Sequence, residues 1–362
     1  MTWAPWVWVA ERIDDRKLRE QMYSIFGPFS LLVLLVIWAV MLIVGFALLL
    51  FAIGSPFLDS SVPAGAGSLL HFGTDLYVSG TTLTTLGPGD VVPRSVWARA
   101  LMIAESGTGL GFVALVISYV PVLYGAFSKR EVSVALLDGR AGSPPTAAEL
   151  LRRHGFDGGQ KALISLLEEW ERWSAEILES HISYPLLCYY RSQHDNQSWL
   201  SALVSVLDAC ALLITTIEGP ASRQAQLTFA MARHALIDLG HVFHLEEREK
   251  QWVEGGRAGR LSEEVFDRLC EALGEIELRL CGDPESMERL TTIRALYEPH
   301  AMALSDYLRM PLPQWVSEPR TKDHWKTVSQ LRLKAAAVLG TRVSHVSEQA
   351  ASVHLHDDGH GF

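Results

Sequence analysis

Two long apolar stretches dominate the pattern of hydrophobic and polar positions. Residues 29–51 contain no charged side chain over 23 positions. A helix rising 1.5 Å per residue crosses a hydrocarbon core of about 30 Å in about 20 residues. The second stretch, residues 97–127, is interrupted only by Arg99 and Glu105. The pattern therefore predicts two transmembrane helices, at about 29–53 and about 97–127.

The segment between them is too short to cross a bilayer and is rich in hydroxyl side chains. It predicts a re-entrant pore helix at about 75–85, with Thr74 as its N-cap and Asp75 in its first turn. Glycines at 87 and 89 follow, and glycine tolerates the positive φ that turns successive carbonyls to one side. Non-helical backbone at membrane depth is stable where it lines a water-filled cavity. We therefore predict a cation-coordinating loop at residues 85–90, shared by several chains.

Residues 28–129 resemble the two-transmembrane pore module of the tetrameric potassium channel superfamily, in its bacterial ion channel form. The family signature is Thr-Val-Gly-Tyr-Gly-Asp, and the matching positions are Thr85, Leu86, Gly87, Pro88, Gly89 and Asp90. The resemblance implies a homotetramer whose selectivity filter is built from these residues, with K⁺ as the permeant ion. Proline at 88 removes an amide N–H and the aromatic ring that braces the family's filter. Potassium conduction is favoured, and nonselective cation conduction is the alternative.

Other pore residues have candidate roles around this loop. Thr84 and Glu105 are expected to support the filter, since an ionisable group within a span usually faces protein or water. Glu105 would brace the filter through the pore-helix threonines or, alternatively, line the pore. The predicted gating hinge comprises four residues of the second span that favour bending, namely Gly107, Gly109, Gly111 and Pro121. Close helix packing is the alternative for the glycines.

The basic residues near the spans predict the orientation. Four precede the first span (Arg12, Arg16, Lys17 and Arg19), two follow the second (Lys129 and Arg130), and Arg94 and Arg99 lie between. Because cytoplasmic flanks carry an excess of Lys and Arg, both termini are expected in the cytoplasm. The prediction is an integral protein of the cell membrane, the inner membrane in a bacterium, with the lipid bilayer as a partner. Residues 1–28, which include three tryptophans, are expected to form a cytoplasmic interfacial segment.

The character of the chain changes after residue 128. Residues 129–145 are predicted to be a linker, with a short strand-like piece at 132–137 and a Gly/Pro-rich joint. Thr146 and Glu149 have capping-box spacing. Helical periodicity then predicts a cytosolic domain at 146–350, followed by a disordered tail at 351–362. The fold class is an all-α membrane protein: two transmembrane helices with a re-entrant pore helix and filter loop, plus an α-helical cytosolic domain.

Chemistry outside the pore is sparse. His234, Asp238 and His241 are spaced i, i+4 and i+7 on one predicted helix, which suits a metal site, although a structural role in a polar core is the commoner alternative. No catalytic arrangement is assigned, so an enzyme is not expected, and no cofactor is expected. The four cysteines show no close pairing and are expected to be reduced, buried thiols.

Charge and composition limit the function classes. The net charge is −10 with no basic block, which argues against nucleic acid as a partner. The sequence predicts a tetrameric cation channel whose cytosolic domain regulates gating or assembly, with an unknown cytosolic ligand. The competing class is a membrane-anchored cytosolic sensor or enzyme with a nonconducting hairpin.

Overall fold

The computed structural model describes residues 3–59, 63, 67–155, 159–192, 197–216, 219–255, 259–274 and 284–317. The predicted tail at 351–362 and the end of the predicted cytosolic domain lie outside these ranges. Regular structure in the described residues is almost entirely helical, which confirms the all-α class. The chain forms two compact units. The pore unit comprises Met1–Lys129 with Ser183–Arg191, and the helical unit comprises Arg130–Ile182 with Ser192–Phe362.

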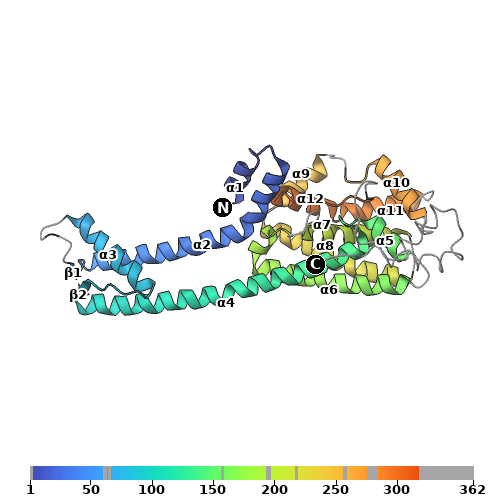
Figure 1. Ribbon diagram of the computed structural model, residues 1–362. Coiled ribbons are helices and arrows are strands. Elements are labelled where there is room, and N and C mark those ends of the chain that lie inside the picture. Colours follow the sequence, from blue (N-terminus) through green and yellow to red (C-terminus); the bar gives the residue numbers. More distant parts are fainter. Residues whose placement is uncertain are drawn as a thin grey trace, which may run out of the picture. The chain divides into compact units, whose positions relative to one another are not determined.

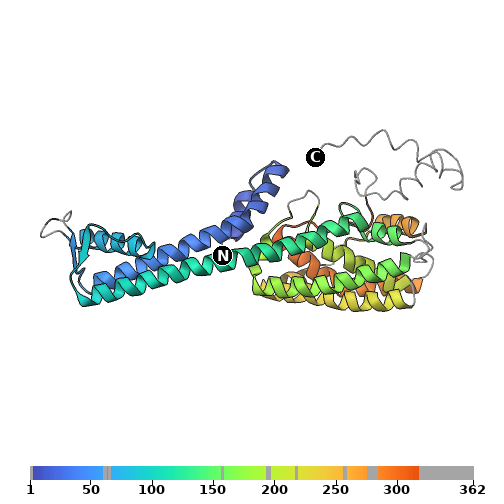
Figure 2. The ribbon, with the colours of Figure 1, turned by 60° about the horizontal axis from the view of Figure 1, so that its bottom comes forward.

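The pore unit is built on two long helices. Its elements are α1 (Trp3–Ala10), α2 (Arg16–Ala52), β1 (Phe57–Asp59), α3 (Ser68–Leu83), β2 (Val91–Pro93), the first part of α4 (Val96–Ala141) and the short 3₁₀ helix η1 (Pro185–Tyr189). Figures 1 and 2 both show α2 and α4 side by side, with α3 and the two strands at one end. Both long helices are long and apolar enough to cross a membrane, and their apolar faces are largely exposed. The chain is an integral membrane protein.

Helix α2 begins 13 residues before the predicted span. Asp15 caps it, because its Oδ1 accepts hydrogen bonds from the backbone N–H of Lys17 at 2.8 Å and of Leu18 at 3.5 Å. The charged turns that follow have no long apolar run. Hydropathy therefore marks the part of the helix that suits lipid, not the point where the helix starts.

The predicted N-cap of the pore helix is wrong. Helix α3 begins at Ser68, so Thr74 and Asp75 lie inside it and are buried. Their polar groups have tertiary partners instead of capping roles. Thr74 Oγ1 donates to Asp59 Oδ2 at 2.7 Å, and Ser55 Oγ donates to Asp75 Oδ2 at 2.6 Å. These contacts hold the pore helix against the connection that follows α2.

The strand-like piece predicted at residues 132–137 is also wrong, because α4 is helical there and runs unbroken to Ala141. Its 46 residues extend about 69 Å, more than twice the thickness of a hydrocarbon core. A short apolar run with β-branched residues does not distinguish strand from helix by its pattern alone. The helix ends where Gly142 adopts a φ of +87°.

The helical unit surrounds one almost completely buried helix. It contains the end of α4 and all of α6 (Gly159–Ser183) except its last residue. Its other helices are α5 (Ala147–His154), α7 (Trp199–Thr216), α8 (Pro220–Val242), α9 (Glu246–Glu254), α10 (Glu263–Gly274), α11 (Pro284–Ala295) and α12 (Glu298–Leu308). Thr146 Oγ1 accepts from Glu149 N–H at 3.3 Å, which confirms the predicted capping interaction at the start of α5. Although α7 is also apolar enough to span a membrane, 16 of its 18 residues are buried among α5, α8, α11 and α12. It is the core helix of this unit.

The cysteines follow the prediction in part. Cys188 and Cys210 are buried, as expected. Cys270 is disulfide-bonded, so the expectation of a reduced thiol is wrong there. Spacing along the sequence does not reveal which cysteines lie together in space.

Candidate functional site

The predicted filter loop is anchored at both ends. At its start, the backbone N–H of Thr84 and its Oγ1 both donate to the carbonyl of Gly80, at 3.2 and 2.7 Å, and close the last turn of α3. At its end, β2 pairs with β1 in an antiparallel ladder that sets Val92 opposite Leu58. The loop is thus held between a helix C-terminus and a strand pair.

The backbone of the loop adopts the predicted positive φ at Gly87 but not at Gly89. Thr85 has a φ of +61° and Gly87 a φ of +74°, both in the left-handed region. Gly87 N–H donates to the carbonyl of Thr81 at 3.0 Å, which ties the loop back to the pore helix. A Cβ built on Gly87 meets no atom within 4 Å, so glycine is required there for its conformation and not for space.

The loop is open to its surroundings within one chain. Leu86 is 80% exposed, Thr85 and Gly89 are also exposed, and Pro88 is half-buried. At its far end, Tyr77 Oη donates to Asp90 Oδ1 at 3.1 Å, so the pore helix positions the carboxylate that follows the filter. In the described chain the loop is thus tied to the pore helix through Gly87 N–H, while most of its residues remain exposed.

Glu105 supports the pore helix through a residue that the prediction did not name. It is fully buried and hydrogen-bonds to Ser79 rather than to the threonines of α3. Ser79 also donates to the carbonyl of Ile43 at 2.8 Å. This chain of polar contacts links α4, α3 and α2. The role of Glu105 in supporting the filter stays a prediction.

The predicted hinge residues fall into two groups. Gly109 lies on the same face of α4 as Glu105, and a Cβ built on it would overlap the carbonyl of Leu83 in the last turn of α3. Its role is therefore close packing. Gly107 and Gly111 have no neighbour within 4 Å of a built Cβ, and α4 continues through Pro121. For these three residues the hinge stays a prediction.

A second cluster lies where the apolar run of α2 begins and that of α4 ends, and we call these two places the inner ends of the helices. Leu31 of α2, Leu123 and Phe127 of α4, and Leu187 of η1 form one buried group. Local patterns did not predict it, because Leu187 is 60 residues beyond Phe127 in the sequence. The local signal that could have indicated it is the set of aromatic residues beside Pro185, namely Tyr184, Tyr189 and Tyr190.

The predicted metal site is not assembled. His234 Nε2 lies 3.3 Å from Asp238 Oδ2, and the His234 side chain is 60% exposed. Within the described part of the chain, no group of three or more His, Cys, Asp or Glu residues is placed to hold a metal ion. Helical spacing brings one pair together and leaves His241 outside it.

A buried histidine lies where α4 enters the helical unit. Arg130 Nη1 contacts His181 Nε2 at 3.3 Å, and since arginine only donates, this nitrogen accepts. The other nitrogen, Nδ1, then carries the proton and donates to the carbonyl of Ile177 at 2.9 Å. Burial, and after it the positive charge of Arg130, lowers the pKa of His181 well below its usual 6.5. The contact therefore depends on a neutral histidine.

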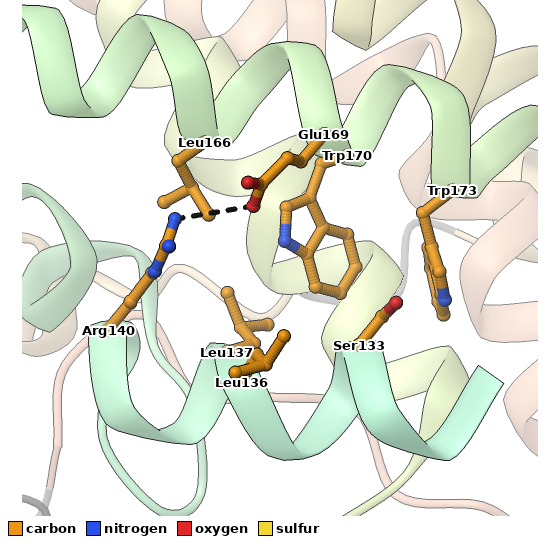
Figure 3. Close-up of a pocket in the computed structure, with 8 residues that line it drawn as sticks. All are labelled: Ser133, Leu136, Leu137, Arg140, Leu166, Glu169, Trp170 and Trp173. Carbon is orange, nitrogen blue, oxygen red and sulfur yellow. Dashed lines mark hydrogen bonds and ion pairs between the residues drawn. The ribbon is translucent and has the colours of Figure 1, made fainter. Parts of the chain in front are cut away.

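A small pocket lies between α4 and α6 in the helical unit (Figure 3). Leu136, Leu137, Trp170 and other side chains line it, and an ion pair between Arg140 and Glu169 at 3.4 Å lies at one side. Its volume of about 30 Å³ is room for about two water molecules.

Comparisons with known proteins agree with the assignment of the pore. Residues 33–123 match the family model described as ion channel, which confirms the resemblance predicted for this region. The chain is 25% identical over 252 residues to an uncharacterized membrane protein, YdjJ, of Bacillus subtilis (strain 168), covering 68% of this chain and 70% of that protein. No solved structure matches. The match to the ion-channel family model includes α3, the predicted filter loop and most of the membrane-spanning part of α4.

Proposed function

We propose that this protein is a homotetrameric cation channel that conducts potassium through the backbone of residues 85–90. The observation that carries the proposal is a loop in an ion-channel pore region with left-handed backbone at Thr85 and Gly87. Such a backbone suits carbonyl oxygens that replace the hydration shell of a cation. Asp90 adds a carboxylate at the end of the loop that attracts cations.

The exposed loop supports assembly from several chains. One loop encloses no axis, and Leu86 is 80% exposed in the single chain. Four copies around an axis would cover this surface and complete a ring of carbonyls. We propose no enzymatic activity. The helical unit regulates gating or assembly, and both termini lie in the cytoplasm.

The test is a planar bilayer recording of the purified protein with potassium on one side and sodium on the other. A reversal potential near the potassium equilibrium value is expected. A value near zero with clear single-channel steps would establish a nonselective cation pore. Silence would favour the anchored sensor or enzyme.

Gly87→Ala is the matched variant for this test. An L-residue in the left-handed region costs about 1–2 kcal/mol, and in a tetramer four copies share one filter. We expect this variant to abolish conduction while the protein still assembles. The control is Gly73→Ala, a helical position of α3 where a Cβ also meets nothing within 4 Å. Normal currents from Gly87→Ala would exclude the filter assignment.

A further inference from the structure

One short segment of the C-terminal half belongs structurally to the pore unit. Ser183–Arg191 begins at the last residue of α6 and ends before α7, and the rest of α6 and all of α7 belong to the helical unit. The segment itself, including η1, packs with Met1–Lys129. The two units are therefore joined by the backbone at α4 and again at each end of this segment. We call Ser183–Arg191 the coupling segment.

The coupling segment packs tightly against α2. A Cβ built on Gly27 would lie 2.6 Å from Cδ2 and 3.1 Å from Cγ of Tyr190, so the ring rests directly on the backbone of α2. Tyr189 packs against Phe26 at 5.3 Å between ring centroids and against Trp3 of α1 at 5.0 Å.

An ion pair extends this contact toward the start of α2. Arg191 Nη1 lies 2.8 Å from Glu20 Oε2, and the guanidinium lies over the ring of Tyr23 at 4.8 Å. The segment is thus fixed to α2 over about two turns of helix, from Glu20 to Gly27.

The same segment also contacts α4. Tyr184 packs against Tyr119 with ring centroids 5.4 Å apart, and Tyr190 packs against Phe127 at 5.5 Å. Leu187 is fully buried with Leu123 between these two contacts. Tyr190 therefore touches Gly27 on one long helix and Phe127 on the other.

We infer that the coupling segment sets the relation between the inner ends of α2 and α4, with Tyr190 against Gly27 as the central contact, and so transmits the state of the helical unit to the opening of the pore. The inference rests on the proposed channel function. Tyr190 is half-buried and contacts both helices, and because packed side chains transmit displacement, a shift of its ring toward either helix would move that helix. A rearrangement of α6 or α7 would thus change the spacing of the inner ends while leaving residues 85–90 untouched.

The first test detects the contact between Gly27 and Tyr190 by crosslinking and requires no measurement of ion current. The full-length protein with Gly27→Cys and Tyr190→Cys is oxidised in membranes, and the linked peptides are identified by mass spectrometry, which separates this pair from the native cysteines. Tyr190 Cγ is 3.1 Å from the built Gly27 Cβ, which brings the two Cβ atoms close to the disulfide range of about 3.5–4.5 Å. A crosslink between the two introduced cysteines is expected. Its absence, in protein that is inserted and assembled, would overturn the inference whether or not the protein conducts.

The second test measures gating. Gly27→Ala should change the open probability of single channels by about threefold or more, since its methyl group meets the Tyr190 ring, and adding Tyr190→Leu should restore it. Gly45→Ala is the matched control, because it lies in the same helix with nothing within 4 Å of its Cβ. Conductance and reversal potential should stay unchanged in all variants, which a general loss of folding would not produce.

Three outcomes decide between the two proposals. An unchanged open probability in Gly27→Ala, or an equal change in Gly45→Ala, would overturn the coupling role. A crosslink in a protein whose wild type never conducts would overturn the channel function, and the coupling with it, while the docking of the segment would stand. A change that Tyr190→Leu reverses is the result that the inference requires.

Discussion

At the scale of single residues, Pro88 is the position that most affects selectivity. It is half-buried in the loop and lacks the N–H and ring that the related signature places there. We predict that Pro88→Tyr raises the permeability ratio of potassium over sodium by about threefold or more, equivalent to about 0.7 kcal/mol. Reversal potentials measure this ratio. Pro93→Tyr, in β2 beyond the filter, is the control, and an unchanged ratio in Pro88→Tyr would contradict the bracing argument.

His181 provides a prediction about pH. Its folded-state pKa is depressed by burial and by Arg130, so the unfolded chain binds a proton more readily. The stability of the helical unit should therefore be highest above about pH 6.5 and fall by about 1.4 kcal/mol per pH unit as the pH drops below that value.

Urea unfolding of the full-length protein between about pH 5 and 7.5 measures this slope. His181→Gln retains an acceptor for Arg130 but does not titrate, so its unfolding curve should lose the slope. His234→Gln, whose wild-type side chain is 60% exposed, is the control and should retain it. Equal slopes in the wild type and His181→Gln would assign the acid sensitivity to other groups.

At the scale of elements, the packing of α4 on α3 depends on Gly109. Its Cα faces the carbonyl of Leu83, one turn from the buried Glu105. We predict that Gly109→Ala forces the two helices apart and lowers the melting temperature of the assembled protein by several degrees, as overpacking costs about 1–3 kcal/mol. Gly111→Ala, with an open site within the chain, is the matched variant. If both variants melt like the wild type, the close approach is not a constraint.

The elements also show where sequence patterns are informative. Long apolar runs located the membrane-spanning parts of α2 and α4, and the Thr146 capping pattern located the start of α5, because both depend on residues near each other in the chain. The start of α3 was misplaced because Asp75 looks like a first-turn acid, whereas its partner is Ser55, 20 residues away. The strand-like reading of residues 132–137 failed because the helix was set by continuity with α4.

In the candidate site, too, local patterns predicted some features and missed others. The positive φ of Gly87 was predictable from the glycine pattern, whereas that of Thr85 was not, and Gly89 does not share it. The contacts of Glu105 with Ser79 and of Gly27 with Tyr190 were not, because they join residues 26 and 163 positions apart. Without a known fold, no local pattern specifies such pairs.

At the scale of the whole molecule, the helical unit contains a cluster of buried, hydrogen-bonded polar side chains around Asp208. In the helical unit, Asp208 lies in the middle of the apolar α7 and pairs with the buried Arg260 through two contacts of 2.6 and 2.8 Å. Tyr297 also donates to Asp208, and burial raises the pKa of that phenol well above its usual range. Glu298 lies 3.3 Å from the same guanidinium. These contacts fix α7, α12 and the segment around residue 260 to one another.

Removing one charge from this centre should unfold one unit selectively. Among the described residues, Asp208→Asn leaves Arg260 with its more distant carboxylate partner, Glu298, and breaking a buried pair costs about 3–5 kcal/mol. We expect the helical unit of the full-length variant to melt at a lower temperature by circular dichroism. Glu247→Gln, which removes an exposed ion pair with Lys250, is the control and should melt like the wild type.

The Asp208→Asn variant also tests whether the helical unit controls the opening of the pore without affecting ion conduction through the filter. The Asp208 network lies wholly in the helical unit, whereas residues 85–90 lie in the pore unit. Between the melting temperatures of the variant and the wild type, conductance and reversal potential should therefore match, because the filter is intact. Open probability should differ, because the coupling segment is then attached to an unfolded unit. Equal open probability at that temperature would mean that the helical unit does not control the pore, and lost conductance would mean that the pore unit needs it to fold.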